Sequence, residues 1–338
     1  MKRRILGGTG MSVSEFALGT MMLGSMGNTD HDESVGMIHA ALDAGINFVD
    51  TADVYSGGES EVIVGKALKG RRDDVVLATK FSMPMGADEN QRGGSRKWIM
   101  RAVEGSLQRL GTDYIDLYQM HRWDPLTDPD ETLSALSDLV RAGKVRAIGS
   151  SLFHPEQIVE TQWVAERRGH QRFRSEQPPY NILLRGIEGS LLPTARRYGM
   201  GVLTFGPLGS GWLSGRADPT AGHRNAGAGT RLFDQSDPAN RAKAEAVREL
   251  GKLADDAGVK LTHLSLAFVL THPAITSVLI GPRTPGQLTD LLAGAEVELS
   301  EEVLDRIDEI VPPGVDVNTN DIMFVPSALG DKRSRRIR

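Results

Sequence analysis

The sequence contains no cysteine. The chain can therefore form no disulfide bond, thiolate nucleophile or zinc–thiolate site, which excludes several classes of secreted protein and enzyme. It also has no apolar run near the roughly 20 residues that a membrane-spanning helix needs. Residues 1–10 carry basic side chains, but no apolar stretch of the kind found in a secretory signal follows them. We therefore expect a cytoplasmic protein with no membrane partner.

Metal-binding and nucleic-acid signatures are also missing. None of the eight histidines belongs to an H-x-H pair or an H-E-x-x-H helix motif, so a metal-dependent hydrolase is disfavoured and we expect no metal. The formal net charge of −5 disfavours nucleic acid as the main partner. One basic segment, residues 332–338, lies at the extreme terminus, where such a run is typical of a solvated tail.

The pattern that is present is an alternation of short apolar runs and amphipathic stretches. It predicts βαβ units and a parallel sheet, and 338 residues suit one barrel domain. The apolar runs are residues 16–20, 46–50, 75–80, 115–121, 145–151, 174–180, 201–208 and 277–281, and helical periodicity covers, among others, 32–44, 95–110, 130–142, 155–168 and 241–257. We therefore predict an α/β fold, one (β/α)8 TIM barrel over residues 1–338 with a flexible tail at about 326–338.

Three further segments shape this prediction. Residues 3–6 and 13–16 flank a glycine-rich stretch, which predicts an N-terminal β-hairpin that closes the bottom of the barrel. Residues 82–94 and 209–240 lack periodicity and follow the third and seventh strands. Both long loops should therefore lie on the C-terminal rim, where barrel enzymes place their active sites.

Four polar residues occur at the carboxyl ends of strands or just beyond them. They are Asp50, Tyr55, Lys80 and His121. A tyrosine has a reference pKa of about 10, so it is a weak acid at neutral pH. A neighbouring lysine cation would lower that pKa, and an aspartate would keep the lysine charged and in place. A neutral histidine can donate a hydrogen bond that orients a substrate oxygen. Together, these four residue types could orient a carbonyl oxygen and transfer a proton to it from the tyrosine.

These residues also carry a resemblance to a known family. The segments Asn47-Phe48-Val49-Asp50-Thr51-Ala52-Asp53-Val54-Tyr55 and Asp116-Leu117-Tyr118-Gln119-Met120-His121, with the strand ending in Lys80, resemble the active-site signatures of the aldo-keto reductases. The stretch Arg92-Gly93-Gly94-Ser95-Arg96-Lys97 makes the chain most similar to bacterial members related to potassium-channel β-subunits. The resemblance implies reduction of an aldehyde or ketone by hydride transfer, with Asp50, Tyr55, Lys80 and His121 as the catalytic tetrad and Tyr55 as the general acid.

No G-x-G-x-x-G motif follows an early strand, so a nucleotide would have to be bound in another way. The same resemblance implies NADPH as the cofactor, bound across the mouth of the barrel. Positions that match the family's cofactor-binding residues are Thr20, Met21, Asp50, Ser151, Gln177, Phe205, Gly206, Pro207, Leu208, Gly209, Arg216, Gly281, Arg283, Gln287 and Asp290. Among these, Arg283 is positioned to pair with a 2′-phosphate, which would favour NADPH over NADH. Leu152 and Leu291 depart from the common pattern, in which polar residues stand at both positions.

The substrate is a small-molecule carbonyl compound that the sequence does not define further. The predicted substrate residues are Tyr55 and His121 together with Met22, Arg122 and Trp123 at the rim. Methionine side chains adapt to several shapes, so a broad range of aldehydes and ketones is compatible with this rim. An NADPH-binding regulatory subunit that senses redox state is the alternative, because an intact tetrad does not exclude it. The sequence offers no argument on oligomeric state.

Overall fold

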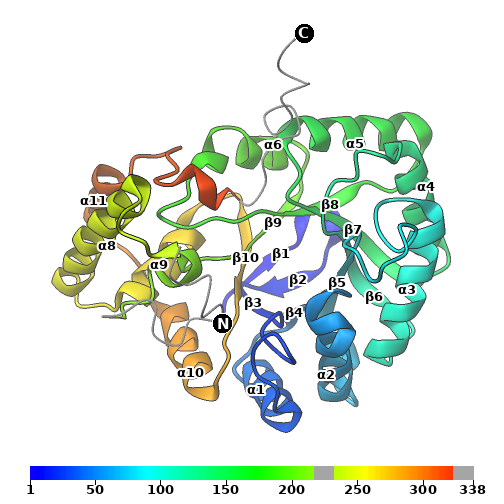
Figure 1. Cartoon of the computed structure of the whole chain (residues 1–338), viewed down its shortest axis with the longest axis horizontal. Helices are drawn as coiled ribbons and strands as arrows, with labels where there is room; N and C mark the ends of the chain where they lie inside the picture. The colour runs from blue at the N-terminus through cyan, green and yellow to red at the C-terminus, as the bar shows by residue number, and fades with distance from the viewer. Residues whose placement is uncertain (217–231, 323–338) are drawn as a thin grey trace.

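A closed barrel of eight parallel strands forms the centre of the computed structural model, which describes residues 1–216 and 232–322 (Figure 1). Around the ring the strands follow the order β10-β3-β4-β5-β6-β7-β8-β9. Their bounds are β3 (Phe16–Gly19), β4 (Phe48–Asp50), β5 (Val76–Phe81), β6 (Ile115–Met120), β7 (Val145–Ser151), β8 (Phe173–Gln177), β9 (Gly201–Thr204) and β10 (Ile275–Ile280). The predicted (β/α)8 barrel is confirmed, and each predicted apolar run overlaps one of these strands.

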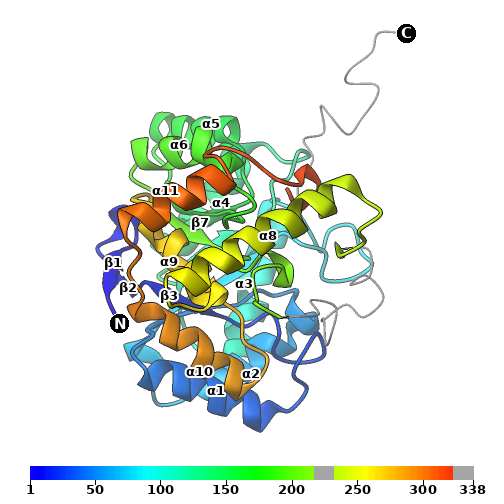
Figure 2. The same cartoon turned by 90° about the vertical axis from the view of Figure 1, so that its left-hand side faces the viewer.

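Helices surround the barrel on its outer face (Figures 1 and 2). They are α1 (His31–Asp43), α2 (Glu59–Leu68), α3 (Arg96–Leu110), α4 (Pro129–Arg141), α5 (Pro155–Arg168), α6 (Leu191–Arg197), α8 (Pro238–Asp256), α9 (Leu261–Thr271), α10 (Pro285–Ala293) and α11 (Glu301–Ile310). In the part of the chain that the structure describes, no helix is long and apolar enough to cross a membrane.

Local sequence signals explain where several helices begin and end. The Ser95 side chain accepts a hydrogen bond from the backbone N–H of Trp98 at the start of α3. Asp128 caps α4 in a similar way, with Pro129 at the first helical position. Gly111 ends α3 with a φ of 63°, a left-handed conformation that glycine adopts without a Cβ clash. Ser95 and Asp128 thus fix where the loops that follow β5 and β6 end, and Gly111 ends α3 before the chain enters β6.

The predicted hairpin is present below the barrel. Its strands β1 (Arg3–Ile5) and β2 (Ser12–Ser14) pair antiparallel. Leu6 and Val13 are fully buried and pack against the apolar residues that fill the barrel interior, among them Phe48, Ala78 and Leu117. The hairpin therefore closes the N-terminal end of the barrel, as predicted.

The hairpin also supports the seam where the last strand meets the first. Val278 of β10 pairs with Phe16 of β3. Beside this pairing, Ser277 Oγ donates to the carbonyl oxygen of Ser14 at 2.8 Å, and the Arg4 guanidinium donates to the carbonyl oxygens of Leu270 and Ile275. The two ends of the barrel sequence are therefore joined by side chains as well as by the strand ladder.

The two long loops follow β5 and β9, as predicted. Residues 82–94 contain no helix or strand. The second loop is shorter than predicted, because α8 begins at Pro238 rather than at Arg241, with Asp237 as its N-cap. Residues 217–231 of this loop and the tail predicted at about 326–338 lie outside the described residues.

Candidate active site

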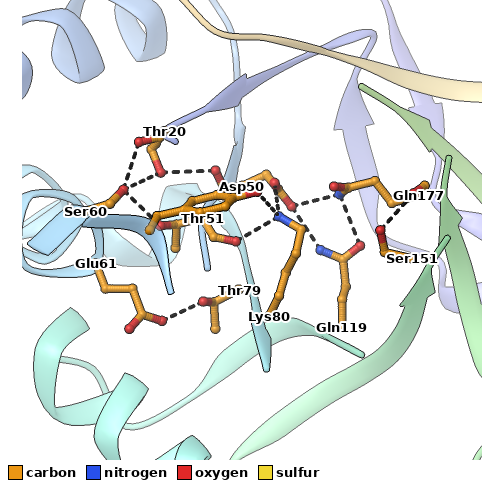
Figure 3. Close-up of polar contacts among 11 residues, drawn as sticks. Thr20, Asp50, Thr51, Ser60, Glu61, Thr79, Lys80, Gln119, Ser151 and Gln177 are labelled. Atoms are coloured by element: carbon orange, nitrogen blue, oxygen red, sulfur yellow. Dashed lines mark hydrogen bonds and ion pairs between the residues drawn. The ribbon is translucent and has the colours of Figure 1, made fainter. Parts of the chain in front are cut away.

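The centre of the site is an ion pair at the open end of the barrel. Asp50 ends β4, Lys80 is the next-to-last residue of β5, and the two side chains are 1 % and 0 % exposed. Lys80 Nζ donates to Asp50 Oδ1 and, at 2.9 Å, to the carbonyl oxygen of Thr51 (Figure 3). Burial lowers the pKa of Lys80, but Asp50 and Tyr55 outweigh this effect and leave the pKa above its usual 10.5. Lys80 is therefore charged at neutral pH.

Two glutamines hold the second oxygen of Asp50, and sequence reasoning missed one of them. Gln119 Nε2 donates to Asp50 Oδ2 at 2.9 Å, and Gln177 Nε2 donates to the same oxygen at 3.0 Å (Figure 3). Gln119 lies two residues before His121 on β6, so strand alternation places both side chains on the inner face. That spacing is the signal that would have found it.

Tyr55 reaches the ion pair from a short turn after β4. It begins η2 (Tyr55–Gly58), and Gly57 and Gly58 of this turn adopt φ values of 65° and 98°. Tyr55 Oη lies 3.4 Å from Lys80 Nζ. Lys80 lowers the pKa of Tyr55, as expected, but desolvation by burial is the larger effect and raises the pKa above 10. The expected net lowering is therefore wrong for the protein alone, and the phenol carries its proton at neutral pH.

His121, the residue directly after β6, completes the group. Its ring and that of Tyr55 meet edge to face, with centroids 5.8 Å apart and an interplanar angle of 82°. Burial, and then the positive charges of Lys80 and Arg122, hold the pKa of His121 well below 6.5. The imidazole is therefore neutral at pH 7 and can donate from one nitrogen only. The structure brings all four predicted tetrad residues together.

The predicted substrate residues other than Tyr55 and His121 come from two loops, one after β3 and one after β6. Arg122 is half-buried, and its backbone N–H donates to Ser82 Oγ at 3.0 Å. Trp123 packs edge to face on Phe153, with ring centroids 5.2 Å apart. Met22 is buried, at 5 % exposure. Their contact with a substrate stays a prediction.

Four of the predicted cofactor residues surround the ion pair. Thr20 is buried, and its backbone N–H donates to the carbonyl oxygen of Asp50 at 3.0 Å. Met21 follows it and is half-buried. Ser151 Oγ donates to the carbonyl oxygen of Gln177 at 2.9 Å (Figure 3). The Gln177 amide nitrogen is engaged by Asp50 and Gln119, which leaves its side-chain oxygen as an acceptor for a further donor.

The remaining predicted cofactor residues after β9 form one stretch. Phe205 is half-buried against the barrel interior. Gly206 follows with a φ of 67°, and a side chain at this position would have no heavy atom within 4 Å of its Cβ. Pro207 is buried, whereas Leu208 and Gly209 are half-buried. This stretch thus offers the Phe205 ring, on which a planar ligand ring could stack, beside a main-chain segment at Gly206 with open space for polar ligand groups. Arg216 is exposed at the last described position before residue 217.

The residues predicted for the adenosine end lie in the turn after β10, which holds Gly281 and Arg283, and on α10, which holds Gln287 and Asp290. Gly281 is exposed, and Gln287 Oε1 accepts from the backbone N–H of Arg283 at 2.9 Å, which fixes the main chain of that arginine. Asp290 Oδ1 accepts from Lys260 at 2.6 Å, so this carboxylate already has a cationic partner on the protein. Their roles toward a cofactor stay predictions.

A second polar cluster lies behind the catalytic strands, and sequence reasoning did not single it out. Asp53 and Glu61 are 1 % and 0 % exposed. Glu61 accepts from Thr79 at 2.5 Å and from Arg109 at 2.7 Å, whereas neither carboxyl oxygen of Asp53 has a hydrogen-bond partner among the described residues. Desolvation, reinforced by the charge of Glu61, raises the pKa of Asp53 to about 8. Asp53 is therefore mostly protonated at neutral pH.

Taken together, the site offers proton chemistry and hydrogen bonding. Within residues 1–216 and 232–322 no group of three histidine or acidic side chains is arranged to hold a metal ion. What the site does present is a protonated phenol beside a buried ammonium and a neutral imidazole. A carbonyl oxygen placed between the phenol and the imidazole would receive a hydrogen bond from each and a proton from the phenol.

Comparison with known proteins agrees with this chemistry. A model of the aldo/keto reductase family matches residues 15–312. The chain is 40 % identical over 326 residues to the "Uncharacterized oxidoreductase YrpG" of Bacillus subtilis (strain 168), covering 93 % of this chain and 97 % of that protein. It is 41 % identical over 290 residues to the "Aldo-keto reductase YhdN" of the same organism, covering 84 % and 85 %. It is also 34 % identical over 322 residues to a "Probable voltage-gated potassium channel subunit beta" of Oryza sativa subsp. japonica, covering 92 % and 97 %. The chain therefore belongs to the aldo/keto reductase family of oxidoreductases.

Proposed function

We propose that this protein reduces an aldehyde or ketone to an alcohol with NADPH, and that Tyr55 is the general acid. The observation that carries the proposal is the placement of Tyr55 Oη 3.4 Å from the buried Lys80 ammonium, edge to face with a neutral His121. Bound NADPH would supply a hydride to the carbonyl carbon. The carbonyl oxygen would then take the phenolic proton, so that the alcohol forms and Tyr55 is left as a phenolate.

Each member of the tetrad has a distinct part in this reaction. Lys80 stabilises the phenolate that Tyr55 becomes when it gives up its proton, because a cation nearby favours the charged form. Asp50 holds Lys80 in place and charged, and Gln119 and Gln177 satisfy its second oxygen. His121 donates a hydrogen bond to the substrate oxygen and orients it. The phenolate regains its proton from solvent once the product leaves.

The residues around the ion pair fit a nicotinamide carboxamide. Such a group has one acceptor oxygen and an amide nitrogen that donates two hydrogen bonds. The Gln177 side-chain oxygen is an acceptor, and Ser151, whose Oγ donates to the main-chain carbonyl oxygen of Gln177, lies on the neighbouring strand. Phe205 would stack on the ring, and Arg283 would pair with the 2′-phosphate that distinguishes NADPH from NADH.

The substrate pocket is compatible with more than one carbonyl compound. Met21 and Met22, which follow β3, would provide adaptable apolar contacts to a substrate. Arg122 adds a cation whose charge acts on both Tyr55 and His121. A substrate with a negative or strongly polar group a few atoms from its carbonyl would be favoured by this cation, so sugar ketones and phosphorylated carbonyl compounds belong in any substrate screen.

The test is NADPH oxidation by the purified protein with small aldehydes, α-diketones, sugar ketones and phosphorylated carbonyl compounds. We expect turnover with wild-type protein and, in Tyr55→Phe, a loss of most turnover, by a factor on the order of 100 to 10,000, the usual contribution of a general acid. NADPH binding should be nearly unchanged in this variant, because only the hydroxyl is removed. Turnover near the wild-type rate in Tyr55→Phe would show that the assigned acid is wrong.

One outcome would favour a different role. Two relatives bear the names of potassium-channel β-subunits, one from Oryza sativa subsp. japonica and one from Schizosaccharomyces pombe. If the wild-type protein binds NADPH tightly but oxidises it with no member of the panel, an NADPH-binding regulatory subunit becomes the better assignment. Multiple turnovers with any carbonyl compound would favour the enzyme.

A further inference from the structure

The turn that follows β7 has an unusual backbone conformation. Leu152 adopts a φ of 58°, in the left-handed region that side chains with a Cβ rarely occupy. Left-handed backbone costs such a residue roughly 1–2 kcal/mol, so the surrounding structure must stabilise the turn. Leu152 directly follows Ser151, the residue proposed above to meet the nicotinamide carboxamide.

The group that holds this turn is the carboxyl of Glu176 on β8. Its side chain is fully buried and lies on the outer face of the barrel, because the neighbouring Gln177 points inward to Asp50. Oε1 accepts from the backbone N–H of Phe153 at 3.0 Å, and Oε2 accepts from Ser150 Oγ at 2.5 Å. The backbone N–H groups of Leu152 and Gln177 also lie close to this carboxyl. Glu176 therefore contacts the chain on both sides of the left-handed residue.

The turn is linked to the inner face of the barrel through the strand pairing. Ser151 of β7 pairs with Gln177 of β8, and Ser150 pairs with Glu176. Ser151 Oγ donates to the carbonyl oxygen of Gln177 at 2.9 Å, and the Leu152 N–H donates to the same oxygen at 3.4 Å. Gln177 in turn donates to Asp50. A shift of the turn would therefore move Ser151 and disturb Gln177, which is hydrogen-bonded directly to the catalytic ion pair.

We propose that Glu176 is a positioning residue for the cofactor, which holds the turn at residues 150–153 so that Ser151 and Gln177 face the nicotinamide carboxamide. The inference rests on the proposed function, because Ser151 and Gln177 have this role only if the chain binds NADPH. Glu176 itself lies on the opposite face of the sheet and touches neither cofactor nor substrate. It acts through the two residues that do.

The burial of this carboxyl agrees with a specific role. Desolvation raises the pKa of Glu176 to about 8, although Ser150 and the backbone N–H groups offset part of the cost. An apolar side chain of similar size would avoid this cost but would leave the Phe153 N–H and the Ser150 hydroxyl without this acceptor. The carboxyl of Glu176 is therefore explained by the hydrogen bonds that it accepts from the turn.

The experiment compares two ligands in direct binding titrations. NADPH carries the carboxamide, whereas 2′-phospho-ADP-ribose shares its phosphates and adenosine but lacks the nicotinamide. In Glu176→Met, which loses the acceptor oxygens at similar size, we expect NADPH affinity to fall roughly 5- to 30-fold, as for one or two lost hydrogen bonds. Affinity for 2′-phospho-ADP-ribose should change by less than about 2-fold, since its contacts lie away from this turn. Glu176→Gln keeps an acceptor for Phe153 and should stay close to wild type with both ligands.

A double-mutant cycle separates positioning from general stability. If Glu176 acts through Ser151, then Glu176→Met should weaken NADPH binding much less in a Ser151→Ala background than in the wild type. Leu152→Gly removes the need to hold a left-handed leucine, so it should restore part of the affinity lost in Glu176→Met. Equal losses for both ligands, or additive losses with Ser151→Ala, would overturn the inference. Failure of the wild-type protein to bind NADPH at all would instead overturn the proposed function.

Discussion

Asp53 allows a quantitative prediction about stability and pH. Its folded pKa is about 8, against 3.8 for the free side chain, so across that interval the folded protein keeps a proton that the unfolded chain has lost. Stability therefore falls as pH rises through this window, by about 1.4 kcal/mol for each pH unit from this group alone. The asparagine of Asp53→Asn does not titrate, so its contribution to the free energy of unfolding does not change with pH. Between pH 5 and pH 7 the free energy of unfolding of the wild type should therefore fall by about 3 kcal/mol relative to that of Asp53→Asn.

The assay is thermal unfolding of both proteins at each pH. For a chain of this length 1 kcal/mol corresponds to roughly 2 °C, so the difference in Tm should widen in favour of Asp53→Asn by roughly 5 °C between pH 5 and pH 7. The test uses how the Tm difference between the two proteins changes with pH, and not its size at one pH, because an asparagine left without partners destabilises the protein equally at both pH values. Asp305→Asn, on the exposed face of α11, controls for the chemical substitution. A Tm difference that stays constant across the pH range would refute the assignment of a buried, protonated Asp53.

Two further predictions concern the catalytic ion pair and the cofactor. Lys80→Met should abolish turnover and lower the free energy of unfolding by about 3–5 kcal/mol, because it leaves the Asp50 carboxylate buried without its cation. In chemical denaturation, the double variant with Asp50→Asn should regain stability, but it should not regain turnover. Recovery of turnover in the double variant would contradict the role of Lys80. Arg283→Ala should raise the KM for NADPH far more than the KM for NADH, since only NADPH carries the 2′-phosphate. Equal increases in both values in steady-state assays would remove that role from Arg283.

The sequence predicted the fold and the tetrad because both depend on short-range patterns. Alternating apolar runs identify the strands, and the carboxyl ends of parallel strands must meet at one end of a barrel. Asp50, Lys80 and His121 could therefore be grouped before their distances were known. Tyr55 joined them because it follows Asp50 by only five residues. The hairpin was predictable for the same reason, since its glycine-rich turn lies between two short segments, residues 3–6 and 13–16, that can pair as neighbouring strands.

The buried carboxyls could not be predicted in this way. Asp53 and Glu61 lie in or beside a helical stretch where an acidic residue is usually solvated, and only the packing of α2 and α3 against the barrel removes them from water. Glu176 follows Ser175 in a strand whose two faces are both buried, so alternation alone does not mark it as unusual. The pKa of Tyr55 was misjudged for a related reason. The attraction of Lys80 was visible in the sequence, but the larger cost of burial depends on the whole fold.

The seam between β3 and β10 has a consequence for how the protein is made. Phe16 finds its strand partner only when Val278 has left the ribosome. At about 5–20 residues per second, this delay is on the order of 10 to 50 s. During that time the nascent chain carries two unpaired strand edges and a hairpin whose apolar residues, Leu6 and Val13, have no completed barrel to fill. The growing chain should therefore be a chaperone client until its last barrel strand emerges, and fragments that end before β10 should aggregate rather than fold.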